Sequence, residues 1–191
     1  MAATLTEAIL KDIEMGNASV RLVEQTDNIT DTTFDDADQI FTTEGTLQIQ
    51  QAEATKTEFK IDQKDAAVAV NYESGEFTIN GTVPSSAIPL FDYFYNKSSN
   101  QPALTTGITS VDGSAKYTEA YGYDLDAKRK KVTMLVESQS KKTAIIFTNV
   151  EMVTSLNWGE VKTTPIGLTF TGTVLAASGT GVPSFIILKS A

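Results

Sequence analysis

The chain of 191 residues contains neither cysteine nor histidine. Their absence excludes thiol nucleophiles, disulfide bonds, imidazole acid–base catalysis and the usual zinc sites. Cations are also scarce, with 15 lysines and arginines against 24 aspartates and glutamates, and a formal net charge of −9. Because tight contact with a phosphate backbone needs clustered lysine and arginine, this charge balance argues against a protein that binds nucleic acid.

Long apolar runs and catalytic motifs are missing as well. No run approaches the ~18 apolar residues that a membrane span needs, and the N-terminus lacks the basic leader and apolar block of a secretory signal. The sequence contains no GxSxG, HExxH or GxxxxGK[ST] motif, and no GxGxxG after a strand. We therefore expect no membrane association, no cofactor, no metal site and no enzymatic activity.

Two segments concentrate charge of one sign. Residues 26–38 are rich in aspartate, but they lack the central glycine and the closing glutamate of an EF-hand loop, so we expect a solvated loop. Residues 128–131 read Lys-Arg-Lys-Lys and precede an apolar stretch. A solvated turn or a contact between subunits is the expected role of this basic cluster.

Alternation of apolar and polar residues is the most informative pattern, and it is clearest over residues 43–83 and 166–174. Such a period of two places one set of side chains against a core and the other against solvent. The core set comprises Leu47, Ile49, Phe77, Ile79, Leu168 and Phe170. The solvent set carries hydroxyls, amides and one carboxylate, without lysine or arginine: Thr46, Gln48, Gln50, Glu76, Thr78, Asn80, Thr169, Thr171 and Thr173.

These patterns predict a mainly β protein, an antiparallel β-sandwich or barrel that forms a single domain over residues 1–191. One flanking helix is expected at about 87–96, after a serine N-cap, and a loop-rich connection at 97–114. Residues 73–75 read as a hairpin turn between two strands. Residues 1–16 fit either a short N-terminal helix or an arm that orders on assembly. Strands are predicted over 20–24, 41–51 with a continuation through 57–61, 67–72, 76–83, 115–123, 132–137, 143–150, 152–158, 163–176 and 185–188.

The connection around residues 55–65 carries charges of both signs. Such a hairpin is usually exposed to solvent, and the same composition suits a contact with a neighbouring copy of the chain. The candidate residues for this contact are Lys56, Glu58, Lys60, Asp62, Lys64 and Asp65.

Several of these segments resemble the phage major tail tube proteins. Residues 43–47, the hairpin at 53–62, residues 75–79 and the helix after Pro84 resemble the first half of that family. Residues 145–150 and 168–173 resemble its second half. The resemblance covers residues 41–96 and 143–176 and extends to tube proteins of contractile injection systems; the N-terminus and residues 97–142 are unmatched.

The resemblance implies a structural virion protein that forms homohexameric rings stacked into a hollow tail tube. The solvent set defined above would line the lumen, through which DNA passes without specific binding, and the helix would lie outside. Its partners would be other copies of itself and the tape measure, terminator and baseplate or tip proteins, with no membrane. The implied location is the virion tail, after assembly in the host cytoplasm.

Two other classes fit parts of the sequence. One is another β-rich virion structural protein, such as a decoration or head-completion protein, which the residues do not separate from a tube protein. The other is a carbohydrate-binding module or glycosidase-like enzyme that uses the acidic loops with Tyr117, Tyr121 and Tyr123. The polar alternation without paired exposed aromatics argues against this second class.

Overall fold

The computed structural model describes residues 17–60, 69–84, 88–157 and 167–190. Within this part of the chain the protein is mainly β, with antiparallel sheets and one helix, α2 (Ile88–Phe94), so the predicted fold class is confirmed. The strands are β1 (Asn17–Glu24), β2 (Asp38–Ile40), β3 (Gln48–Gln51), β4 (Thr55–Phe59), β5 (Ala69–Glu73), β6 (Phe77–Val83), β7 (Tyr95–Lys97), β8 (Ile108–Thr109), β9 (Lys116–Tyr117), β10 (Tyr123–Ala127), β11 (Lys130–Ser138), β12 (Thr143–Asn157), β13 (Gly167–Val174) and β14 (Phe185–Lys189).

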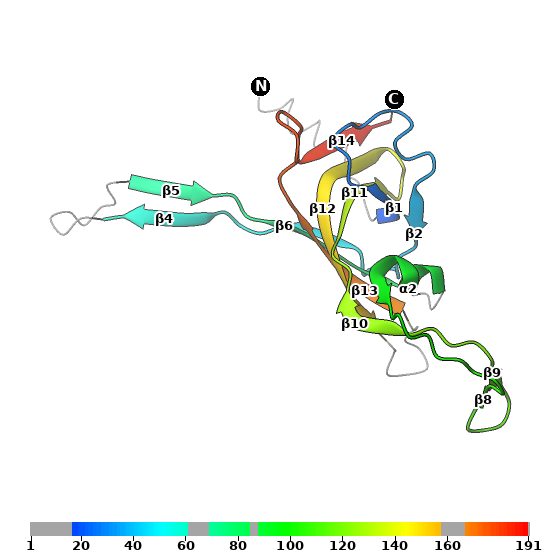
Figure 1. Cartoon of the computed structure of the whole chain (residues 1–191). Helices are drawn as coiled ribbons and strands as arrows, with labels where there is room; N and C mark the ends of the chain where they lie inside the picture. Colours follow the sequence, from blue (N-terminus) through cyan, green and yellow to red (C-terminus); the bar gives the residue numbers. More distant parts are fainter. Residues whose placement is uncertain (1–16, 61–68, 85–87, 158–166, 191) are drawn as a thin grey trace.

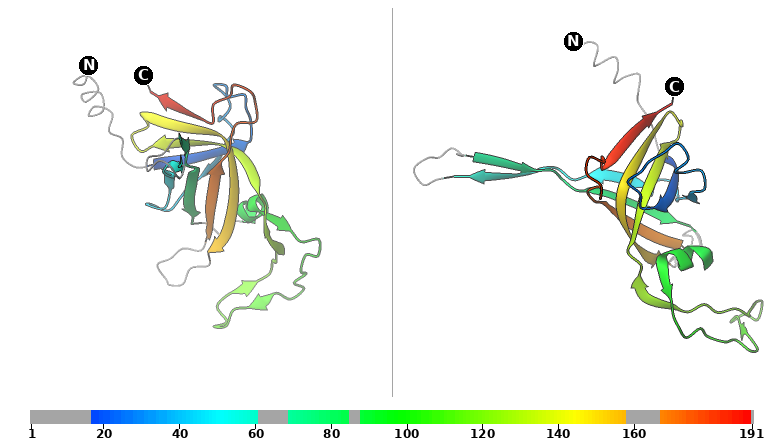
Figure 2. Two further views of the ribbon diagram at one scale, coloured as in Figure 1. Left: turned by 90° about the vertical axis from the view of Figure 1, so that its left-hand side faces the viewer. Right: turned by 45° about the horizontal axis from the view of Figure 1, so that its top comes forward.

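The body of the molecule is one strongly curved sheet with the strand order β2-β1-β11-β12-β13-β6-β3. Its two end strands, β2 and β3, are consecutive in the chain and are joined by residues 41–47. This connection runs along β6, where the backbone N–H of Thr43 donates to the carbonyl of Thr82 at 2.8 Å. The ends of the sheet thus come together around the core (Figures 1 and 2).

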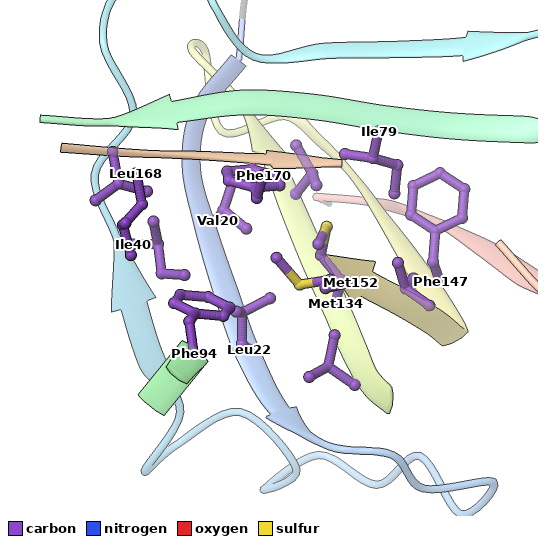
Figure 3. Close-up of a cluster of buried hydrophobic side chains, with 14 residues drawn as sticks. Val20, Leu22, Ile40, Ile79, Phe94, Met134, Phe147, Met152, Leu168 and Phe170 are labelled. Atoms are coloured by element: carbon purple, nitrogen blue, oxygen red, sulfur yellow. The ribbon is translucent and has the colours of Figure 1, made fainter. Parts of the chain in front are cut away.

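The core lies inside this curve and is built from alternate residues of nearly every strand of the body (Figure 3). Ile79, Leu168 and Phe170 are at most 1% exposed, as their alternation predicted. Leu47, Ile49 and Phe77 are partly buried and pack against the same cluster. The predicted core residues are therefore confirmed.

Helix α2 covers one open end of the curved sheet and anchors itself through Phe94, which is fully buried (Figures 1 and 3). The predicted helix at 87–96 is too long at its C-terminal end. Tyr95 already belongs to β7, which pairs with β10, and the carbonyl of Phe94 accepts a hydrogen bond from the backbone N–H of Lys128 at 2.8 Å. Strand pairing therefore ends the helix although the aromatic pattern continues.

The predicted hairpin turn at 73–75 is wrong. Strand β5 pairs with β4, whereas β6 pairs with β3 and β13, so the chain passes straight from β5 to β6. The backbones approach closely at this passage, because a Cβ built on Gly75 would lie 1.8 Å from the carbonyl oxygen of Ala52. Gly75 therefore allows two backbones to lie in close contact, and it does not form a turn.

Two hairpins project from the body in different directions (Figures 1 and 2). The first arm is the β4–β5 hairpin, which extends the β3–β6 pair away from the core. The second arm comprises residues 97–123 and carries β8 and β9 near its end. The segment 97–114, predicted as loop-rich, forms one side of this second arm.

Other predicted strands differ in extent from the observed ones. The prediction over 41–51 is too long, because residues 41–47 form the connection described above. The prediction over 115–123 is replaced by β9 and β10, and residues 143–150 and 152–158 form one strand, β12, as far as Asn157. The acidic segment 26–38 is a loop and turn as far as Ala37, as expected. The N-terminal segment 1–16 and residues 163–166 of the last long prediction lie outside the described residues.

Candidate functional site

Four neighbouring strands, β3, β6, β13 and β12, present one continuous polar face to solvent. Their registers place Gln48, Asn80, Thr171 and Val153 in one row across the sheet. The adjacent rows are Gln50, Thr78, Thr173 and Glu151 on one side, and Thr82, Thr169 and Ser155 on the other. These residues are called the polar face below.

The intervening residues on the same strands point into the core, which establishes the direction of the polar face. Ile79, Phe170 and Met152 are at most 1% exposed, and Thr154 is also buried. A Cβ on Gly81 would lie 2.6 Å from the ring of Phe170, so Gly81 lies on the inner side as well. Since side chains alternate along a strand, the residues between them face outward.

The chemistry of the polar face is nearly uniform. It contains hydroxyls and amides, one apolar side chain, Val153, and one carboxylate, Glu151, but no lysine or arginine. The hydroxyls of Thr82 and Thr169 lie 3.5 Å apart, within hydrogen-bonding distance across neighbouring strands. Such a surface can accept and donate hydrogen bonds to water, but it offers no cation to an anionic polymer.

Two of the residues predicted for this face lie beside it. Thr46 is in the turn before β3, where its hydroxyl donates to the carbonyl of Thr43 at 2.7 Å and accepts from the backbone N–H of Thr82 at 3.1 Å. Glu76 is exposed and precedes β6, at the passage where its carbonyl accepts from the N–H of Ala52. The other predicted members, Gln48, Gln50, Thr78, Asn80, Thr169, Thr171 and Thr173, lie together on the polar face.

Sequence reasoning missed the contribution of β12. Glu151, Val153 and Ser155 alternate with buried residues, so the signal was present in the sequence. The pairing of β12 with β13, which brings these residues beside Thr169, Thr171 and Thr173, is not visible from either strand alone.

The first arm exposes side chains on both of its faces. Lys56 and Lys60 both pair with Glu58, the second at 3.5 Å, and these contacts hold the pKa of the Glu58 carboxyl below its ordinary value, with the hydrogen bond from Lys56 as the largest cause. Phe59 and Tyr72 are 63% and 65% exposed on this arm. Asp62, Lys64 and Asp65, also predicted for a contact between copies, lie outside the described residues.

Of the three tyrosines considered for sugar binding, Tyr121 and Tyr123 share a polar neighbourhood, because Lys97 lies 5.6 Å over the ring of Tyr121 and pairs with Asp92. Tyr117 is on β9 near the end of the second arm. The hydroxyl of Tyr121 donates to Glu119 at 2.9 Å, and that of Tyr123 donates to Asp92 at 2.7 Å beside the ring of Phe91. Burial raises the pKa of Tyr123 to about 12, with a further contribution from its hydrogen bond to Asp92. Tyr117, opposite Ile108 on the β8–β9 pair, is thus separate from Tyr121 and Tyr123, and the three rings do not share one set of contacts.

Metal centres and membrane-spanning helices are absent from the described residues. No group of three or more histidine, cysteine, aspartate or glutamate side chains there is placed to hold a metal ion. No helix in that part of the chain is long and apolar enough to cross a membrane. No family model matches the chain, and no curated protein matches it either.

Proposed function

We propose that this protein is the subunit of a phage tail tube, in which homohexameric rings stack into a conduit for DNA. The observation that carries the proposal is the polar face of β3, β6, β13 and β12. A sheet that buries one face in a core and keeps the other polar and almost uncharged suits the wall of a channel.

The charge of the face fits the passage of DNA. Duplex DNA carries one negative charge per ~1.7 Å, and each lysine or arginine that neutralised a phosphate would add to the affinity of the wall for it. Exposed apolar patches would favour contact with the bases of single strands or with other proteins. The polar face avoids both, and its single carboxylate, Glu151, would repel phosphate weakly.

The width of the face fits a hexamer. Four strands spaced ~4.8 Å apart cover ~19 Å, so six copies would give a circumference of ~115 Å before strand tilt is counted. The corresponding diameter is about 37 Å between backbones, and side chains on both walls would leave a channel of roughly 25 Å, wider than a DNA duplex.

The two arms also support an assembly. They extend away from the core and expose large apolar side chains, including Phe59, Tyr72, Ile108 and Val111. A monomer gains no stability from exposing such residues, whereas a neighbouring copy could cover them. Under this proposal the protein resides in the virion tail after assembly in the host cytoplasm, with the tape measure, terminator and baseplate or tip proteins as further partners.

Negative-stain electron microscopy of the purified protein tests the proposal directly. We expect rings with a central hole, and tubes of stacked rings at higher protein concentration. Particles that stay monomeric at all concentrations would contradict it. Binding of monomers to empty capsids instead would indicate a decoration protein.

A further inference from the structure

The turn between β11 and β12 and the adjacent strand β14 form a basic end of the molecule. Lys141 and Lys142 occupy the turn, and Lys189 on β14 lies opposite Thr143 of β12. Residues 138–150 and 184–190 contain no aspartate or glutamate. The adjacent carboxylate, Glu137 opposite Ala144, pairs with Arg21, so Lys141 and Lys142 give this end a local excess of positive charge that attracts an acidic surface.

Strand β14 also exposes apolar side chains along an open edge. Phe185, Ile187 and Leu188 are 41%, 61% and 42% exposed. Among the described residues β14 pairs only with β12, so its outer edge carries backbone groups with no strand partner there. An apolar strand with an open edge favours pairing with another chain.

Strand β2 is a second open edge with the opposite charge. It stands at the end of the strand order, and the described residues provide a partner strand, β1, on one side only. Residues 24–41 carry six carboxylates and no lysine or arginine. The nearest cation along the sheet is Arg21 of β1, which lies opposite Gln39 and pairs with Glu137 of β11 at 3.7 Å, so its charge is already matched.

An open apolar groove accompanies the β2 edge. Two hollows of about 240 and 270 Å³ share Gln39 and Ile40 of β2 and Leu90 of α2. Phe41, at the far end of the groove, is 68% exposed. The β2 edge thus combines an apolar groove with acidic residues beside it. This combination complements the β14 edge, which is apolar and basic.

We propose that β14 of one copy pairs antiparallel with β2 of a second copy. An antiparallel register that sets Lys189 opposite Asp38 also sets Ile187 opposite Ile40 and brings Lys141 and Lys142 toward the aspartates before β2. A parallel register would carry Lys189 past the acidic end of β2. The charges therefore select the antiparallel arrangement.

The two edges are different surfaces of the same chain, so the contact is head-to-tail. Contacts of this kind close into rings or continue as filaments. This proposal rests on the proposed function, because the β14–β2 pairing would be the contact between neighbouring subunits of the tube.

Disulfide trapping tests the register, because the chain has no cysteine of its own. A Leu188→Cys copy mixed with a Gln39→Cys copy should form a crosslinked dimer under mild oxidation, since the antiparallel register sets these residues opposite each other. The control pair is Leu188→Cys with Phe41→Cys, which a parallel register would favour. Crosslinking of the control pair alone, or of neither pair, would overturn the proposed pairing.

Charge reversal tests the complementarity. The double variant Lys141→Glu/Lys142→Glu and the double variant Asp35→Lys/Asp36→Lys should each weaken self-association about tenfold or more, as measured by sedimentation velocity at low salt. An equimolar mixture of a Lys141→Glu/Lys142→Glu chain with an Asp35→Lys/Asp36→Lys chain should recover association. In the mixture, the acidic turn of the first chain meets the basic segment before β2 of the second chain.

The outcomes separate this contact from the proposed function. If both double variants still form tubes as the wild-type protein does, and the mixture shows no rescue, the tail-tube proposal stands and the β14–β2 contact is rejected. Wild-type protein that self-associates through the trapped register but never forms hollow rings would retain the contact and reject the tube.

Discussion

Phe170 and Thr171 are neighbours on β13 with opposite environments, one 1% exposed in the core and the other exposed on the polar face. We expect Phe170→Ala to lower the free energy of unfolding by ~3–5 kcal/mol, because it removes a buried ring and leaves a cavity. Thr171→Ala should change it by less than about 0.5 kcal/mol. Urea denaturation of both variants measures the difference, and equal losses would mean that the two faces are assigned wrongly.

Tyr123 offers a second test at the scale of single residues. Its folded pKa of about 12 lies above the ordinary value of about 10, so the fold favours the neutral phenol. The resulting stabilisation is complete below pH ~10 and is lost as the pH rises through about 12. The side chain of Tyr123 is part-exposed and screened by solvent, so the effect on total stability should be small.

The variant Asp92→Asn should lower the pKa of Tyr123, because it replaces the charged acceptor of the phenol's hydrogen bond by a neutral one. The pKa should stay above 10, since burial is the larger cause. Phenolate absorbance during alkaline titration, with the same variant in a Tyr123→Phe background as control, isolates this residue. An unchanged pKa would remove Asp92 from the explanation.

At the scale of elements, the first arm extends the β3–β6 pair without contributing to the core. Every described side chain on β4 and β5 is exposed. Its sequence therefore serves something other than the stability of the isolated subunit. Contact with another copy is the role that the proposed tube gives it.

Replacing residues 55–73 by an Asn-Gly turn should leave a folded subunit that no longer forms long tubes. The new turn would join the chain near Ala52 and Gly75, where the backbones already meet. Stability should change by no more than about 1 kcal/mol, because the deletion removes no core contact. Thermal unfolding and electron microscopy measure the two effects, and tubes of normal length would exclude the arm from assembly.

At the scale of the whole molecule, the polar face matters through its repetition in a tube. Gln48→Lys with Thr171→Lys places cations on β3 and β13, separated by Asn80 of β6, so the two lysines are not adjacent. The fold should tolerate both changes, because exposed strand positions accept polar residues. Six copies per ring would give the channel a dense cationic lining.

Tubes of this double variant should assemble normally but retain DNA. Each phosphate engaged would release counterions, so retention should fall steeply as salt rises. The control variant Gln48→Glu with Thr171→Glu should retain none. Measured on assembled tails, normal DNA delivery by the lysine variant at low salt would contradict a lining that must not bind DNA.

Alternation along single strands was enough to determine which residues are buried in the core and which are exposed to solvent. Ile79, Leu168 and Phe170 are buried, and Thr171 and Gln48 are exposed, because a period of two is a local property of an extended chain. The fold class followed for the same reason. The absence of cysteine, histidine and catalytic motifs likewise belongs to the sequence itself.

Only the tertiary structure decided which strands are neighbours. Strand pairing depends on hydrogen bonds between distant residues, so the sequence placed a turn at Gly75 where two paired strands continue, and it did not place Glu151 and Ser155 beside β13. Thr46 likewise lost its expected place on the polar face, because its hydroxyl bonds to Thr43 and Thr82 in a turn that closes the sheet. Local pattern gives each strand two faces, whereas the contacts between strands determine what surface those faces make together.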